Sequence, residues 1–224
     1  MNIWNLYKGE RFIKPLNAMV WRVAVVGDKH CLRALVDTAQ EHVILDEMVM
    51  KASLKKEISH EIFSSFYCDA LKGGCRFSKM VEPSLWYGSL TQQGAFEEAS
   101  YYLKQFYQDT TATFGLTEIM LSTYQSVVST PEGVDLTASP FDLYQDKISS
   151  KETYTYSQSL GQALRKSGVC AALYYSARTT ALTKNIVVFS EAAWSGEHEQ
   201  YVFNQQFWSC IGGVACVEVK CLGF

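Results

Sequence analysis

The residues best suited to chemistry lie in one stretch, residues 73–106. Arg76 follows a Gly-Gly pair, Tyr87 ends a short aromatic run, and an acidic pair, Glu97 and Glu98, falls in a predicted helix. A carboxylate at the edge of a packed helix face either pairs with a cation or has a chemical task. Arg76 and Tyr87, upstream in the same stretch, are the candidate neighbours of such a carboxylate.

The phase of this helix, which is predicted to begin near Gln92 after a turn at residues 88–89, separates the two acids. At about 100° per residue, one apolar stripe contains Ala95, Phe96, Ala99, Tyr102, Leu103 and Phe106. Glu97 points almost opposite the stripe and is expected to be solvated. Glu98 lies at the margin of the stripe, so it alone is expected to face a cleft packed beneath the helix.

Arg22 and Ser176 are two further candidates, each with an ordinary alternative. Arg22 lies inside a β-rich run, residues 19–26, where an unpaired guanidinium is costly to bury. It either binds an anion or extends to the edge of the strand. Ser176 ends a predicted strand over residues 169–175, a common place for a functional residue, but taken alone it is better explained as a turn residue. The Gly-Gly pair before Arg76 is likewise as well explained by a plain turn.

The elements that must position these residues alternate unevenly. Further helices are predicted at residues 31–52 and 156–166, and further strands at 115–129, 134–136, 186–189, 201–208 and 213–220. Residues 130–142 read as a loop-rich connection and the only weak candidate for a domain boundary. Neither GxGxxG nor GxxxxGK[ST] occurs, which argues against a doubly wound dinucleotide fold and a P-loop. We therefore predict a single α/β (α+β) domain over residues 1–224, with a mixed, strongly bent sheet.

Composition limits the class of protein. The chain has 224 residues, 48% of them hydrophobic, and a net charge of −3, which argues against a dedicated nucleic-acid or polybasic membrane surface. No apolar run approaches the roughly 18 residues of a transmembrane helix, and no secretory signal is recognisable. The seven cysteines form no CxxC, and the four histidines lack metal-ligand spacing. These features predict a cytoplasmic protein with reduced thiols and no bound metal.

Several separated phrases together resemble the RES domain family. They are WRV (21–23), LVDTAQEHVILDEMV (35–49), GCRF (74–77), LWYGSLTQQGAFEEA (85–99), VDLTASPFD (134–142) and SLGQALRKSGVCAALYYSAR (159–178). The resemblance covers residues 20–190, and the strands predicted within residues 200–220 are assigned to the same domain. It implies a fold similar to ADP-ribosyltransferase toxins. It also implies a bacterial toxin, paired with an antitoxin, that consumes NAD by phosphorolysis or hydrolysis.

The resemblance also implies roles for the candidate residues. Glu98 would stabilise the positive charge that develops on the ribose when the nicotinamide–ribose bond breaks. Arg22 and Arg76 would bind the pyrophosphate, with one of them alternatively holding an acceptor phosphate. Tyr87 would stack on the nicotinamide ring or bond a ribose hydroxyl. Ser176 would donate a hydrogen bond to phosphate or to the carboxamide.

The resemblance leaves other functions open. NAD is the expected substrate, inorganic phosphate a candidate co-substrate, and no cofactor is required. The alternatives are an ADP-ribosyltransferase that modifies a protein, and a catalytically silent relative that only binds a partner. The expected partner is an antitoxin that blocks the cleft. Neither nucleic acid nor membrane is expected to bind directly, and the oligomeric state is left open.

Overall fold

The computed structural model describes residues 2–28, 41, 44, 74–109, 117–194, 202–212 and 217–222. A seven-stranded sheet with the order β1-β2-β5-β4-β3-β6-β7 is the scaffold. Its strands are β1 (Lys14–Asp28), β2 (Trp86–Ser89), β3 (Thr117–Asp135), β4 (Ala171–Tyr175), β5 (Lys184–Val188), β6 (Phe203–Gly212) and β7 (Val217–Cys221). The helices are α1 (Ile3–Leu6), α5 (Gln92–Asp109), α6 (Gln145–Ile148) and α7 (Thr155–Lys166), with 3-10 turns η1 (Gly9–Phe12), η2 (Phe141–Tyr144) and η3 (Glu191–Ala193).

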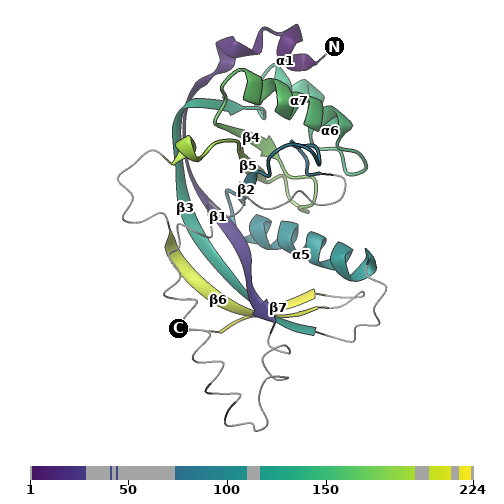
Figure 1. The fold of residues 1–224 in the computed structure, drawn as a ribbon, viewed down its shortest axis with the longest axis vertical. Helices are drawn as coiled ribbons and strands as arrows, with labels where there is room; N and C mark the ends of the chain where they lie inside the picture. Colours follow the sequence, from purple (N-terminus) through teal and green to yellow (C-terminus); the bar gives the residue numbers. More distant parts are fainter. Residues whose placement is uncertain are drawn as a thin grey trace.

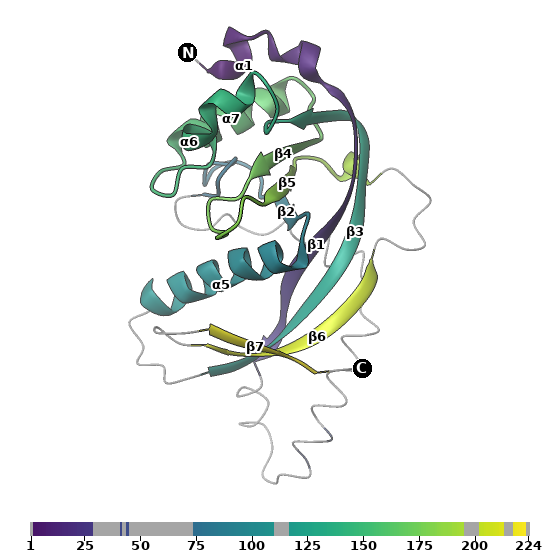
Figure 2. The same cartoon turned by 180° about the vertical axis from the view of Figure 1, so that it is seen from behind.

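The two longest strands, β1 and β3, form a curved antiparallel ribbon that runs through the whole fold (Figures 1 and 2). Their pairing extends from Lys14 opposite Gly133 to Asp28 opposite Ile119. One end of β3 pairs in parallel with β4, and the other end pairs antiparallel with β6. The ribbon therefore carries one group of strands at each end, and α5 lies between the two groups (Figure 1).

Five of the strands close into a circuit. From β1 the pairing passes to β2, β5, β4 and β3, and β3 pairs with β1 again. The link between β1 and β2 is narrow, with Trp21 opposite Ser89 as the paired residues. A sheet that returns to its own first strand must bend strongly. The prediction of a mixed, bent sheet in an α/β fold is confirmed, since β3 and β4 are parallel and the other paired strands antiparallel.

Two segments that were predicted to be turns or loops are strand instead. The first four residues of the predicted connection 130–142 continue β3, so the loop prediction is wrong there, whereas the short strand predicted at 134–136 is found at residues 134 and 135 as the end of β3. The register of β1 and β3 shifts between Lys14 and Leu16, a bulge that places Pro15 and Pro131 where regular pairing is interrupted. The proline that suggested a loop is thus accommodated at the bulge.

The turn predicted at Gly88 and Ser89 is also wrong, because both residues belong to β2 and pair with Ile186 and Asn185 of β5. The glycine has a packing reason: a Cβ atom on Gly88 would lie 2.7 Å from the Trp86 ring. The predicted helix at 156–166 is confirmed as α7, and Gly168, with φ of +75°, follows its end. The strands predicted at 169–175 and 186–189 are found as β4 and β5 with small shifts of their ends, and the strand predicted at 201–208 continues to residue 212 in β6. Of the strand predicted at 213–220, residues 213–216 lie outside the described residues, and residues 217–220 belong to β7.

Several predictions fall outside the described residues. Of the helix predicted at 31–52, only Glu41 and Ile44 are described, and both are helical. The four histidines and three cysteines also lie outside the described ranges: His30, His42, His60, His198, Cys31, Cys68 and Cys216. Among the helices that are described, none has the length and apolar character needed to cross a bilayer.

The main apolar core lies between α7, the N-terminal segment and β4. Trp4, Leu160 and Leu164 are fully buried there, with Phe77 and Val187 packed into the same cluster. Because Phe77 follows Arg76 directly, this core fixes the backbone that presents the arginine. A second cluster fills the strand circuit and contains Leu16, Val20, Trp86, Tyr124, Val128, Ala171, Ile186, Val188, Ala193 and Trp194.

The contact between α7 and this backbone depends on Gly161. A Cβ atom there would lie 2.1 Å from the carbonyl oxygen of Phe77. We expect Gly161→Ala to lower the free energy of unfolding by about 1–3 kcal/mol, because overpacking outweighs the roughly 1 kcal/mol gain in helix propensity. Gln162→Ala, at an exposed position of the same helix, is the control and should leave stability unchanged or slightly raised. Denaturant unfolding of both variants measures this, and equal stability of the two would contradict it.

Candidate active site

A cavity of about 320 Å³ lies where α5 faces the closing point of the strand circuit. Its wall combines residues from β1, the segment before β2, β2 itself, α5 and the paired strands β4 and β5. The charged residues in this wall are Arg22, Arg76 and Glu98. The remaining lining residues are Trp21, Val23, Gly74, Cys75, Ser84, Leu85, Tyr87, Gly88, Ser89, Ala95, Ala99, Tyr102, Tyr154, Tyr174 and Asn185.

Glu98 is held by two neutral donors from the β4–β5 region. Its Oε1 atom accepts a hydrogen bond from the Ser176 hydroxyl at 2.5 Å and from the Asn185 side-chain amide at 2.8 Å. Within the described chain, no hydrogen bond uses the other carboxylate oxygen, Oε2. Glu98 lines the cavity and Glu97 does not. The carboxylate is therefore fixed by one oxygen while the second remains for a ligand.

Ser176 follows β4 directly and acts on the cavity through Glu98 without lining it. Its hydroxyl oxygen accepts hydrogen bonds from the backbone N–H groups of Arg178 and Thr179, at 3.0 and 3.2 Å. These two donors occupy the oxygen, which leaves the hydroxyl hydrogen to point at Glu98. Ser176 is thus both a turn residue and a partner of the carboxylate, which joins the two alternatives of the sequence analysis.

Arg76 is buried, with 4% of its surface exposed, and its contacts are to neutral groups. Its Nη1 donates to the carbonyl oxygens of Ile148 and Ser150, at 3.2 and 2.9 Å. Its guanidinium lies 4.8 Å from the centre of the Tyr154 ring. Among the residues that the structure describes, no carboxylate forms an ion pair with Arg76. Because a buried cation is costly without a counter-charge, this position favours a bound anion.

Arg22 lines the cavity from β1. Its Nη1 donates to the Tyr87 carbonyl oxygen at 2.9 Å, and its guanidinium lies 5.1 Å from the Trp86 ring centre. The side chain is half-buried and lines the cavity. It therefore does not simply extend into solvent from the strand edge, as one sequence-based alternative proposed.

The hydroxyl group of Tyr87 is hydrogen-bonded to other groups of the protein. Its O–H group donates to the Cys75 sulfur at 3.1 Å, and its oxygen accepts from the Phe77 backbone N–H at 3.2 Å. Burial raises the pKa of Tyr87 well above its ordinary value, with the nearby Cys75 thiol as the next cause. With the hydroxyl occupied and neutral, the ring is the part of Tyr87 that suits a ligand in the cavity.

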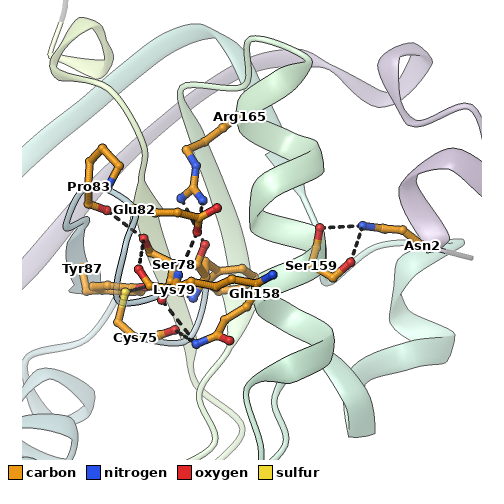
Figure 3. Close-up of polar contacts among 11 residues, drawn as sticks. Asn2, Cys75, Ser78, Lys79, Glu82, Pro83, Tyr87, Gln158, Ser159 and Arg165 are labelled. Atoms are coloured by element: carbon orange, nitrogen blue, oxygen red, sulfur yellow. Dashed lines mark hydrogen bonds and ion pairs between the residues drawn. The ribbon is translucent and has the colours of Figure 1, made fainter. Parts of the chain in front are cut away.

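The segment that carries Arg76 is anchored on α7 (Figure 3). The Gln158 side-chain amide donates to the carbonyl oxygens of Cys75 and Ser78, at 3.1 and 3.3 Å. Arg165 donates to the Phe77 carbonyl and forms an ion pair with Glu82 at 2.5 Å. Gly74 has a φ of +77°, so the second glycine of the Gly-Gly pair serves a turn there while also lining the cavity.

The predicted apolar stripe of α5 is divided between two faces. Ala95, Ala99 and Tyr102 line the cavity, whereas Phe96 and Leu103 pack on the other side in a cluster with Ile119, Leu121 and Cys210. The Phe96 and Trp208 ring centres are 4.7 Å apart. The helix is therefore packed between the two strand groups and has no single buried face.

Glu97, which was predicted to be solvated, is partly exposed, and it also has hydrogen-bond partners that the sequence did not predict. Its carboxylate accepts hydrogen bonds from the Gln93 side chain at 2.9 Å, the Thr180 backbone N–H at 2.8 Å and the Thr180 hydroxyl at 3.4 Å. The helix phase placed Glu97 away from Glu98 correctly, but the loop after Ser176 reaches round to it. Adjacent acids of one helix therefore hold the same loop from two sides.

Sequence reasoning missed Asn185, Tyr174, Tyr102 and Tyr154, which all line the cavity. Tyr174 and Asn185 lie opposite each other in β4 and β5. This pairing depends on the register of the two strands, which no local sequence pattern predicts. Burial raises the pKa of Tyr174, and the charge of Glu98 raises it further. The pKa of Tyr102 is also raised, first by burial and then by its hydrogen bond with Tyr154. Both phenols are therefore neutral hydrogen-bonding groups at physiological pH.

Comparison with known proteins identifies a protein family and a solved structure of similar fold. The model of the RES domain matches residues 54–208, more than half of the chain and a range that includes Arg76, Tyr87, Glu98 and Ser176. The crystal structure of the M. tuberculosis MbcT-MbcA toxin-antitoxin complex contains a chain of similar fold, with a TM-score of 0.53 and 11% sequence identity. The alignment covers 88% of this chain and 87% of that chain. No curated protein matches.

The contacts of Glu97 lead to a pH-dependent contribution to stability. The hydrogen bond from Gln93, followed by that from the Thr180 backbone, lowers the pKa of Glu97 from its ordinary value of 4.5. A lowered folded-state pKa adds stability above the unfolded-state value, and that stability is lost as the pH falls through the folded-state value. We expect Glu97→Gln to be less stable at pH 7 by up to about 1 kcal/mol, with the deficit disappearing below the lowered pKa.

Thermal or urea unfolding from pH 3 to pH 7 measures this effect. Glu152→Gln, which removes an exposed acid, is the matched control and should follow the parent at every pH. A Glu97→Gln deficit that stays constant down to pH 3 would show that the charge of Glu97 is not its source.

Proposed function

This chain belongs to the RES domain family, and from that premise we propose that it is a toxin-like enzyme that cleaves the nicotinamide–ribose bond of NAD. The observation that carries the proposal is the arrangement of charge in one cavity. Among the described residues of its wall, two guanidinium groups, Arg22 and Arg76, accompany one carboxylate, Glu98, which is held by neutral donors. A dinucleotide substrate needs both cationic and anionic groups in its site. Its anionic pyrophosphate would bind the arginines, and its reacting sugar, which becomes positive, would be stabilised by the carboxylate.

The reaction breaks the bond between the anomeric carbon of the ribose and the pyridinium nitrogen. The electron pair of that bond goes to the nitrogen, so nicotinamide leaves as a neutral molecule and positive charge develops on the sugar. In our proposal the free oxygen of Glu98 lies near the ribose and stabilises this charge. An oxygen of phosphate or water then bonds the anomeric carbon, and a water nucleophile releases a proton. The products are ADP-ribose phosphate or ADP-ribose.

The two arginines and Tyr87 supply binding in this proposal. Arg76 is buried against neutral acceptors, so a pyrophosphate or phosphate anion would provide the missing counter-charge. Arg22, from β1, adds a second guanidinium. The Tyr87 ring would stack on the nicotinamide, because its hydroxyl is already bonded to Cys75 and Phe77.

A partner protein is the second part of the proposal. The structural relative described above is part of a toxin-antitoxin complex. We propose that this chain is likewise restrained by an antitoxin, which covers the mouth of the cavity and keeps NAD out. The proposal rests on family membership together with this fold similarity, and expression of the isolated chain tests it.

The decisive variant for the chemistry is Glu98→Gln. The amide oxygen of glutamine can still accept from Ser176 and Asn185, so we expect the fold and NAD affinity to persist. Turnover should fall by about a hundredfold or more, because one charged contact to the transition state is lost. Glu97→Gln, outside the cavity, should keep most of the turnover. NAD loss and product chromatography, with and without phosphate, measure both variants and identify the acceptor. Parent-like turnover by Glu98→Gln would refute the assigned role.

The restraint by an antitoxin predicts a phenotype. Production of the parent chain alone should deplete cellular NAD and stop growth, because nothing blocks the cavity. Production of Glu98→Gln at the same level should leave both NAD and growth unchanged. Cellular NAD and optical density, followed after induction, measure the effect. A parent chain that is active on NAD in vitro yet harmless at high yield would count against the toxin proposal.

A further inference from the structure

Asn185 is a buried polar residue at the centre of the candidate site. It is the second residue of β5, it is 2% exposed, and its side chain lines the cavity. Its amide nitrogen donates to Oε1 of Glu98 at 2.8 Å. It also lies directly across from Tyr174 of β4. The residue therefore contacts the carboxylate from a rigid paired strand, the kind of element that holds a side chain in a fixed orientation.

The chemistry of the carboxylate fixes which end of the amide faces it. An ionised carboxylate only accepts hydrogen bonds, so the donor end, Nδ2, must point at Glu98. The carbonyl oxygen, Oδ1, is thereby turned away from Glu98. This oxygen is buried and has no hydrogen-bond partner within the described chain. A buried acceptor without a donor is costly, so its retention beside a cavity calls for a ligand that supplies the donor.

We propose that Oδ1 of Asn185 accepts a hydrogen bond from the carboxamide N–H of the nicotinamide group, so that Asn185 selects an amide-bearing ring over the corresponding acid. The inference rests on the proposed function and adds a specificity-determining residue to it. Two kinds of donor surround the bond that breaks: the ribose hydroxyls and the carboxamide. The free oxygen of Glu98 is charged and is the stronger acceptor for the hydroxyls, which leaves the neutral amide oxygen for the carboxamide.

The selection follows from the orientation of Asn185. Nicotinic acid is ionised at neutral pH and presents only acceptor oxygens. Beside Oδ1, these oxygens would find another acceptor. Of the two N–H groups on Nδ2, one donates to Glu98, and a hydrogen bond between Asn185 and Tyr174 partly offsets the raised pKa of that phenol. A site built to hydrogen-bond a substrate group rejects the analogue that lacks it strongly, because its own buried polar group is then left unpaired. Asn185 would thus reject the acid analogue and orient the amide substrate with the same atom.

The test compares turnover of NAD with turnover of nicotinic acid adenine dinucleotide, the analogue in which the carboxamide is a carboxylate. We expect the parent protein to prefer NAD in kcat/KM by about a hundredfold or more. In Asn185→Ala the preference should fall by at least about tenfold. Loss of the Nδ2 hydrogen bond to Glu98 would lower turnover of both substrates, so the ratio isolates the contribution of Oδ1.

Ser176→Ala is the matched control. It removes the other donor to Oε1 of Glu98 without touching Oδ1, so its turnover should fall while the ratio stays at the parent value. If Asn185→Ala keeps the parent ratio, or Ser176→Ala loses it equally, the inference is overturned although NAD cleavage stands. If the folded parent consumes no NAD, the proposed function itself fails, and the inference fails with it.

Discussion

The antiparallel pairing of β1 with β3 is the constraint on which the rest of the fold depends. A ribbon that pairs from Lys14 opposite Gly133 to Asp28 opposite Ile119 cannot remain flat, because strands twist and each bulge adds to the twist. Its two ends therefore face different directions and carry different strands. The circuit of five strands closes beside the middle of the ribbon, where Trp21 pairs with Ser89. Arg22, the next residue, thereby reaches the cavity that α5 covers.

The separation of opposite charges gives this cavity its character. Within the described chain, Glu98 is bonded by a hydroxyl and an amide, and Arg76 by two carbonyl groups. A direct ion pair between them would satisfy both and leave little for a ligand. Neutral partners fix the position of each charged group without cancelling its charge. The protein thus keeps a cationic and an anionic group in one cavity, which suits a substrate that is anionic at its phosphates and becomes cationic at its sugar.

Local sequence patterns predicted an element well where that element packs against the rest of the protein through a single face. The helix over 156–166 has a single buried face, and its period predicted α7 closely. Helix α5 lies between two strand groups, so its apolar residues divide, and Glu97 meets a loop that no helix phase could place. Gly88 was mistaken for a turn because its small size serves contact with the Trp86 ring. No local sequence pattern identified Asn185, because its contacts are with the strand opposite and with Glu98 of a helix 87 positions away in the sequence.

The hydrogen bond between Tyr87 and Cys75 bears on the reactivity of the site towards electrophiles. A thiol reacts as its thiolate, and burial raises the pKa of Cys75, an effect only partly offset by the hydrogen bonds from Tyr87 and the neighbouring backbone. The sulfur in the cavity wall is therefore kept protonated and poorly nucleophilic. Oxidants and alkylating compounds that enter the cavity meet an inert group there, whereas the exposed Cys221 on β7 has no such shelter.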